Sequence, residues 1–182
     1  MTRNSQLIEK LINWHKQIHP DYCGSNTPSA DSKSQLDDLV FHILKPLEEQ
    51  FNEVIISYGF NSSELNRYVQ RVNPRDTGPR EDQHAASELN LAGNRICIRD
   101  GAACDLWVKG FEHKMHLVAK FITEHLPFDR LYYYGNDRPI HISFGPEHSR
   151  YIQYRRTRTD GKRVLGKVIK LAEASDYFAS LD

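Results

Sequence analysis

VIISYGFNSSELN, residues 54–66, is the stretch that decides the fold prediction. VIIS has the short apolar run of a buried strand, and YGFNSS after it predicts a turn. Ser62 or Ser63 can then cap a short helix over SELNRYVQRV, because a serine hydroxyl accepts a backbone N–H of the first helical turn. A strand followed at once by a capped helix predicts a fold that mixes both kinds of element.

Upstream of this stretch, the sequence predicts two helices joined by a loop. Apolar residues recur close to the helical period over residues 5–18. CGSNTPSADS is polar and rich in turn-forming residues, so it predicts a linker or an exposed loop. Asp31 or Ser32 caps a second helix, which Pro46 is expected to kink or end.

Downstream, the sequence predicts a long loop, two hairpins and two further helices. Pro, Gly and charged residues at 73–83 predict the loop, and NRICIRDG predicts a strand or hairpin arm ending in a turn. CDLWV predicts a buried strand, and residues 111–126 predict an amphipathic helix. LYYY and PIHISF, joined by GNDR, predict one hairpin. YIQYRRT and KRVLGKV predict a second hairpin, and LAEASDYFASL predicts a C-terminal helix.

This order of elements predicts a single α+β domain over residues 1–182, with helices packed on one face of a mainly antiparallel sheet. Residues 1–33 would form an N-terminal helix and linker. Residues 34–145 would form the core, and residues 146–182 a C-terminal hairpin and helix.

The composition is that of an ordinary soluble globular protein, with 182 residues, 39% hydrophobic, 26% charged and a formal net charge of zero. The overall charge does not point to nucleic acid or to an anionic membrane. No stretch reaches the roughly 20 apolar residues of a membrane span. The first residues lack the apolar core of a secretory signal, so we expect synthesis in the cytosol. Cys23, Cys97 and Cys104 have no CxxC spacing and are expected to be free thiols.

Three separated residues carry the functional prediction: His84 in DQHAAS, Asp105 in GAACDLWV and His141 in RPIHISF. Two imidazoles and one carboxylate are ligands that zinc takes when its fourth position stays open for water or substrate. Each of the three residues lies in a segment that is predicted to be a strand or a strand edge. Such a segment would hold a metal ligand at a fixed position. A polar helix face explains two further histidine pairs better than a metal does: His15 with His19, and His113 with His116.

Taken in order, the segments resemble the zinc D-Ala-D-Ala carboxypeptidases and related cell-wall endopeptidases, whose fold also occurs in the amino-terminal signalling domain of hedgehog proteins. VIISYGFNSSELN resembles the family's strand followed by SGYRS-x-ELN. DQH and GAACDLWV resemble the two halves of its SQHLTGRAADI segment. LPFDRLYYY resembles FDQLIYE, and PIHISF resembles WVHVSF. The resemblance covers about residues 34–145 and implies a metallopeptidase-like core with His84, Asp105 and His141 as zinc ligands.

Three departures from the family pattern affect substrate binding and catalysis. Asn61 stands where the family has an arginine that holds a substrate carboxylate, and asparagine cannot make that bidentate charged contact. The family's short spacer between the first two implied ligands is expanded here to 20 residues, and the inserted part, SELNLAGNRICIRDG, would lie beside the metal. The family's catalytic glutamate falls near Tyr134 or Gly135, where this chain has no carboxylate. The nearest one is Asp137.

As the carboxylate nearest to that position, Asp137 is the candidate general base, and Tyr134 is a second candidate catalytic residue. Turn propensity explains Asp137 equally well. Asn61, Ser62 and Gln83 are the candidate substrate contacts.

We therefore expect a zinc-dependent peptidase that cleaves a peptidoglycan peptide or a D-Ala-type bond through zinc-activated water, released to the cell wall if it is of phage type. One alternative is a catalytically weak or inactive zinc-binding domain that recognises a partner. Another is an intracellular zinc hydrolase with a different substrate. Basic residues of the last hairpin predict either a guarded edge strand or a site for an anionic partner: Arg155, Arg156, Arg158, Lys162 and Arg163.

Overall fold

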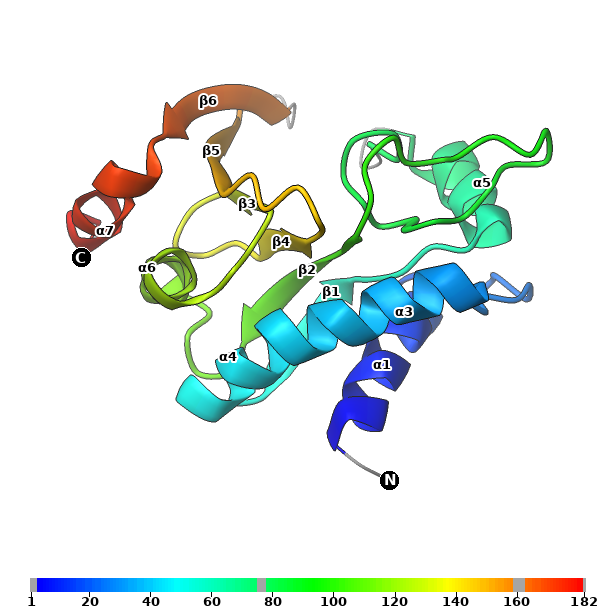
Figure 1. Ribbon diagram of the computed structural model, residues 1–182, viewed down its shortest axis with the longest axis horizontal. Helices are drawn as coiled ribbons and strands as arrows, with labels where there is room; N and C mark the ends of the chain where they lie inside the picture. Colours follow the sequence, from blue (N-terminus) through cyan, green and yellow to red (C-terminus); the bar gives the residue numbers. More distant parts are fainter. Residues whose placement is uncertain (1–2, 75–77, 159–162, 182) are drawn as a thin grey trace.

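The computed structural model describes residues 3–74, 78–158 and 163–181 (Figure 1). Its first elements are α1 (Arg3–Asn13), α2 (His15–Ile18), α3 (Ala30–Leu39), the π-helical segment η1 (Val40–Leu44), α4 (Lys45–Gln50), β1 (Val54–Tyr58) and α5 (Ser63–Val72). They are followed by β2 (Ala102–Val108), α6 (Met115–His125), β3 (Arg130–Tyr133), β4 (Ile140–Phe144), β5 (Tyr151–Thr157), β6 (Arg163–Ile169) and α7 (Leu171–Ala179).

The six strands form one mixed sheet in the order β1-β2-β4-β3-β5-β6. Neighbouring strands are antiparallel except β3 and β5, which are parallel. The parallel pair arises because residues 145–150 carry the chain from β4 past the end of β3, so that β5 pairs with the other side of β3. The predicted α+β class is confirmed, and the predicted hairpins β3–β4 and β5–β6 are both present.

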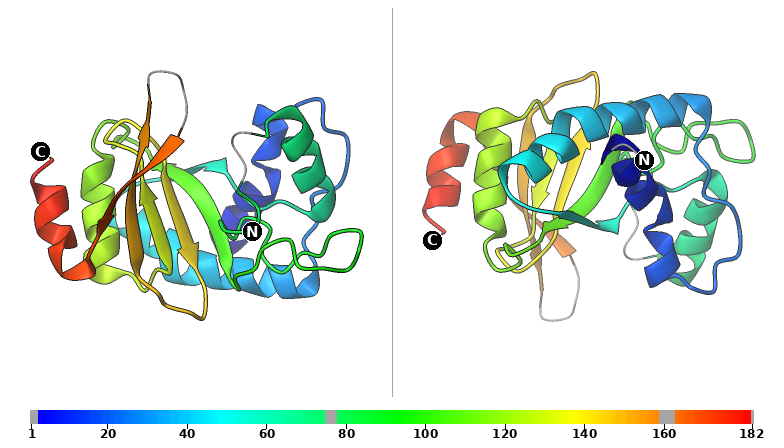
Figure 2. Two further views of the ribbon diagram at one scale, coloured as in Figure 1. Left: turned by 90° about the horizontal axis from the view of Figure 1, so that it is seen from above. Right: turned by 90° about the horizontal axis from the view of Figure 1, so that it is seen from below.

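Helices from both ends of the chain cover one face of this sheet (Figure 2). α3 packs on β2 and β4, α6 packs on β2, and α7 packs on β5 and β6. α1 contacts β1, α3 and η1 instead, and lies with α5 beyond the β1 edge of the sheet (Figure 2). The opposite face of β3 and β4 is turned away from α3, α6 and α7.

Alternating side chains give the central strands one apolar and one polar face. Leu106 on β2 and Ile142 on β4 are fully buried in the core beneath the helices. Burying each such side chain contributes about 1.5–3 kcal/mol, so the core strongly favours one register. The residues beside them in sequence, Asp105 and His141, must then point to the other face.

Pro46 does not end the second helix, because α3, η1 and α4 follow one another from Ala30 to Gln50. It lies in the first turn of α4, directly after the wider π-helical turns of η1. A proline lacks the backbone N–H of a helix interior, and its ring needs extra room. The wider π-helical turn supplies that room, so the helix continues past the proline.

The insertion after His84 does not contain the predicted strand, and the alternative, a hairpin arm, is reduced to a single pair of bridged residues. Leu89 and Arg95 form one isolated β-bridge, and the rest of this part is turns and bends. The Asn90 side chain accepts the backbone N–H groups of Ala92 and Asn94, at 2.9 and 3.1 Å. Such local side-chain bonds compete with a strand ladder, which is why the apolar pattern of NRICI misled the prediction.

The described residues contain no helix that combines the length and the apolar character needed to cross a membrane. All three cysteines are free, as predicted. Cys23 is exposed, whereas Cys97 and Cys104 are buried. Burial raises the pKa of the Cys104 thiol well above its ordinary value, so this cysteine is a core residue and not a reactive thiolate.

Candidate metal centre

One row of side chains crosses the sheet on the face turned away from α3 and α6. The strand register pairs Tyr58 with Asp105, Asp105 with His141, and His141 with Tyr132. Directly paired residues on neighbouring strands share a face, with Cβ atoms about 4.5–5.5 Å apart. Asp105 and His141 are therefore brought together by register, although they lie 36 residues apart in the sequence.

His84 reaches this row from a loop outside the sheet. The preceding residue, Gln83, has a φ of 59°, which is uncommon for a residue with a side chain and turns the chain locally. The His84 carbonyl accepts the Asn61 N–H at 3.0 Å. The His84 ring packs edge-on against Tyr58, with ring centroids 4.6 Å apart. The loop is thus held against β1 and the turn that follows it.

The three residues predicted as metal ligands lie together. Ligating atoms of His84, Asp105 and His141 all fall within 4.8 Å of one another. His141 Nδ1 is 2.8 Å from Asp105 Oδ1, and His84 Nε2 is 3.4 Å from the same oxygen. Both histidines are buried, and the Asp105 side chain is 16% exposed. A carboxylate therefore stands between two imidazoles, with limited access to solvent.

Burial and the neighbouring charges shift the pKa values of these three residues in opposite directions. Burial favours a higher pKa for Asp105, but hydrogen bonds from His141 and His84 outweigh it and hold that pKa far below its ordinary value. Burial lowers the pKa of His141, and Asp105 offsets this only in part. For His84, burial also lowers the pKa, but the charges of Asp82 and Asp105 outweigh it and raise the pKa. Asp105 is therefore ionised, which is the form that binds a metal.

The surroundings of the two rings fit a metal ion. His84 Nδ1 lies 3.1 Å from the Gly59 carbonyl oxygen, and when the neutral ring donates there, Nε2 carries the lone pair that a metal would take. His141 Nε2 is buried without a hydrogen-bond partner, a costly state for a polar atom. The cluster could hold a metal ion. In the ranges that the structure describes, it is the one such group, and neither helical histidine pair belongs to another.

The three candidate substrate contacts all have partners within the protein. Ser62 caps α5, and Gln83 is fully buried and donates to the Asp129 carboxylate at 3.0 Å. Asn61 is 2% exposed and donates to the Tyr58 hydroxyl at 2.9 Å, while its Oδ1 has no partner. Ser62 and Gln83 therefore support the scaffold, and Asn61 keeps one polar atom unpaired beside the cluster.

Asp137 and Tyr134, the two candidate catalytic residues, lie in the segment between β3 and β4. Asp137 is exposed. Its charge adds to burial and to neighbouring tyrosines in raising the pKa of Tyr133, which packs in the core on the helix side. The carboxylate outside the cluster whose charge acts on both imidazoles is instead Asp82, two residues before His84.

Tyr132 is the aromatic neighbour that the sequence reasoning missed. Its ring stacks on His141, with centroids 4.6 Å apart and planes inclined by 13°. The alternation along LYYY could have identified it, because Leu131 and Tyr133 face the core and the residue between them must face the cluster. Tyr134 follows the last residue of β3.

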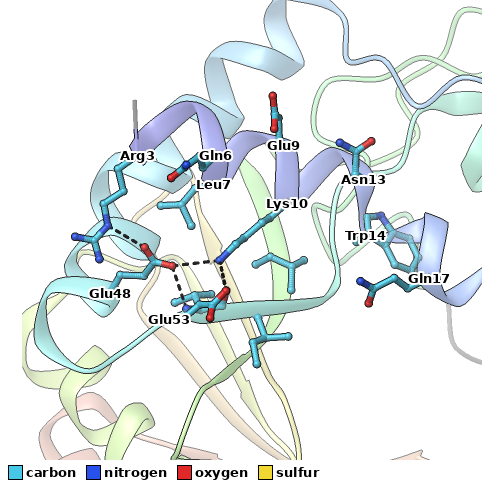
Figure 3. Close-up of a pocket in the computed structure, with 13 residues that line it drawn as sticks. Arg3, Gln6, Leu7, Glu9, Lys10, Asn13, Trp14, Gln17, Glu48 and Glu53 are labelled. Atoms are coloured by element: carbon cyan, nitrogen blue, oxygen red, sulfur yellow. Dashed lines mark hydrogen bonds and ion pairs between the residues drawn. The ribbon is translucent and has the colours of Figure 1, made fainter. Parts of the chain in front are cut away.

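A cavity of about 640 Å³ lies elsewhere, between α1 and β1 (Figure 3). Ion pairs cross its wall, from Arg3 to Glu48 at 2.9 Å and from Lys10 to Glu53 at 3.2 Å (Figure 3). Its charges are thus paired with one another, and its size alone does not mark a functional site. The hollow beside His84 is too small to admit a water molecule.

No family model, curated protein or solved structure matches this chain. The fold and the site define an α+β protein with a largely buried His–Asp–His cluster that could hold a metal ion. Its function must therefore be argued from the chemistry of that cluster and of the residues around it.

Proposed function

We propose that this protein is a zinc-dependent hydrolase of the peptidase type. The observation that carries the proposal is the convergence of His84, Asp105 and His141, from three separate segments, on one point. Two imidazoles and a carboxylate form a ligand set of catalytic zinc sites, which keep a further position open. The resemblance of residues 34–145 to D-Ala-D-Ala carboxypeptidases and hedgehog-type domains supports the same choice. It makes peptidoglycan peptides and D-Ala peptides the first substrates to test.

Each part of the site has a role in this chemistry. His84 Nε2, Asp105 and a ring nitrogen of His141 would hold the ion. Zinc bound there would supply a water ligand with a pKa of about 7. The Gly59 carbonyl orients the His84 ring, and the stacked Tyr132 ring orients His141. Side chains held in this way need little rearrangement to bind a metal, which favours high affinity.

Cleavage of purified peptidoglycan tests the proposal directly. Zinc-loaded protein is expected to release D-alanine or to cut cross-links, and the same protein kept in a chelator is expected to do neither. Mass spectrometry of the released fragments identifies the bond that is cut. A protein that holds one zinc but cleaves neither peptidoglycan nor D-Ala peptides would exclude the peptidase.

Asp137→Ala decides whether the candidate general base acts as one. We expect hydrolysis within about twofold of the wild type, because Asp137 is exposed in a turn and its charge acts on Tyr133. The measurement is the initial rate on the peptidoglycan fragment cleaved best by the wild type. A loss of about 10²–10⁴-fold would instead assign to Asp137 the proton transfer that a glutamate performs in the family.

Zinc affinity is expected to fall as the pH is lowered from about 8 to about 6, because a histidine must be neutral to bind the ion. In the folded protein the pKa of His84 lies above its ordinary value of 6.5. A proton therefore competes with zinc at His84 already above that pH, whereas Asp105 stays ionised throughout. Competition titrations against a chelator at several pH values measure this effect. An affinity that is constant over the range would contradict it.

A second candidate function is a zinc-stabilised binding domain without hydrolytic activity. Asn61 favours this function, because its amide group donates to Tyr58 and cannot hold a substrate carboxylate as an arginine would. A third candidate is an intracellular zinc hydrolase with an anionic substrate, which the basic residues of the last hairpin favour. Zinc content together with cleavage assays separates the binding domain from both hydrolases.

A further inference from the structure

The basic residues of the C-terminal hairpin do not form one patch. β5 lies inside the sheet, between β3 and β6, so a guarded edge strand does not explain its charges. Arg155 and Arg156 follow one another on β5 and point to opposite faces. Arg155 points to the face of the metal cluster, where it contacts Tyr132, and Arg156 is exposed. Lys162 and the side chain of Arg163 lie outside the described residues.

Arg155 is connected to the metal cluster through a single aromatic ring. Its guanidinium carbon lies 3.8 Å from the centroid of the Tyr132 ring. His141 stacks on one face of that ring, so the guanidinium must occupy the other face. A cation–π contact of this kind fixes the position of a guanidinium and leaves its N–H groups able to donate.

The charge of Arg155 is unpaired within the described part of the chain. Two other arginines near the cluster have acidic partners, Arg99 with Glu81 at 2.9 Å and Arg130 with Glu147 at 3.8 Å. Arg155 has none there, and its Nε is buried without a hydrogen-bond partner. A half-buried cation in this state is stabilised by an anion that approaches from solvent.

We propose that Arg155 binds an anionic group of the substrate, a carboxylate or a phosphate, beside the metal. This inference rests on the proposed zinc site. A guanidinium offers two parallel N–H groups to a planar carboxylate or to a phosphate. Asn61 cannot make that contact, so β5 supplies the positive charge that the turn after β1 lacks. Because the Tyr132 ring separates Arg155 from His141, an anionic group bound by Arg155 would lie at a fixed distance from the metal and from the bond that is cut.

Anion binding to zinc-loaded protein tests the inference with Arg156→Gln as the matched control. Wild type, Arg155→Gln and Arg156→Gln are titrated by calorimetry with N-acetyl-D-alanyl-D-alanine, with its C-terminal amide and with inorganic phosphate. We expect Arg155→Gln to weaken binding of the preferred anion by about 10–100-fold, the effect of losing a hydrogen bond to a charged group. Arg156→Gln, on the other face of the same strand, should bind as the wild type does.

The choice of probes separates the sources of the anion. Tighter binding of the peptide acid than of its amide identifies a peptide carboxylate, and tighter binding of phosphate identifies a phosphorylated substrate. Equal binding by all three proteins, or no anion binding by the zinc-loaded wild type, overturns the inference and leaves the zinc site intact. Absence of zinc in all three proteins overturns the proposed function instead. Titration of the metal-free proteins with phosphate then still compares Arg155→Gln with Arg156→Gln.

Discussion

His84→Ala is expected to abolish stoichiometric zinc binding and, with it, all zinc-dependent hydrolysis. The substitution removes one of three ligating side chains and leaves Asp105 hydrogen-bonded to His141 at 2.8 Å. Loss of a partner that only orients a ligand already costs about 10–100-fold in metal affinity, so loss of a ligand should cost more. Atomic emission spectroscopy after dialysis measures the zinc held per chain. The wild type should hold one ion and the variant none.

His113→Ala is the matched control, because this histidine is exposed and belongs to no cluster of three ligands in the described ranges. It should hold as much zinc as the wild type. Thermal melting of the metal-free proteins shows whether His84→Ala still folds, so that loss of metal is not confused with loss of structure. One zinc per chain in a folded His84→Ala protein would remove the basis for the proposed function.

The local elements of the fold could be predicted because their patterns are strong. CDLWV and PIHISF are short apolar runs, and the turn GNDR between LYYY and PIHISF indicated the hairpin of β3 and β4. The insertion was the failure, since an apolar run in NRICI looks like a strand. The Asn90 side chain accepts hydrogen bonds from two backbone N–H groups of this segment and stabilises a turn. The periodicity of apolar residues gives no information on such hydrogen bonds.

The sequence was enough to predict which residues belong to the cluster, but not how they are arranged in space. His84, Asp105 and His141 stood out because of their chemistry and the family resemblance. Their convergence depends on the register between β2 and β4, which places Asp105 opposite His141. That register is fixed by the buried face of both strands, and single-strand patterns leave it open.

The parallel pairing of β3 with β5 could not be foreseen, and the surroundings of the cluster depend on it. This pairing puts Tyr132 beside Gln153 and brings Arg155 over the Tyr132 ring. A hairpin pattern predicts that a strand pairs with its neighbour in sequence. Here, the segment between β4 and β5 crosses the end of β3, so that β5 pairs with β3. Long-range pairing therefore determines which arginine stands near His141, and local sequence does not.

Asp129→Ala is expected to destabilise the fold and to weaken zinc binding, although Asp129 does not belong to the cluster. Its carboxylate is fully buried and accepts three hydrogen bonds: from the Ser149 N–H at 2.9 Å, the Ser149 hydroxyl at 2.6 Å and the Gln83 amide at 3.0 Å. A buried donor left without an acceptor costs about 1–3 kcal/mol. Ser149 is exposed and its donors can turn to water, whereas the buried Gln83 amide keeps only the Asp100 carbonyl as an acceptor. The expected loss is therefore about 1–3 kcal/mol, which lowers the melting temperature by roughly 2–12 °C in a chain of this size.

The effect on zinc follows from the position of Gln83 directly before His84. Through Gln83, Asp129 ties the loop that carries His84 to the segment between α6 and β3. Without that tie, the loop is held against β1 only by the Asn61–His84 backbone bond and the packing on Tyr58. We therefore expect zinc affinity to fall by about 10–100-fold, as it does when a partner that orients a ligand is lost. Asp137→Ala is the control, because an exposed carboxylate should change stability by less than about 0.5 kcal/mol. An Asp129→Ala protein with wild-type melting and wild-type zinc affinity would show that the loop holds His84 in place without this network.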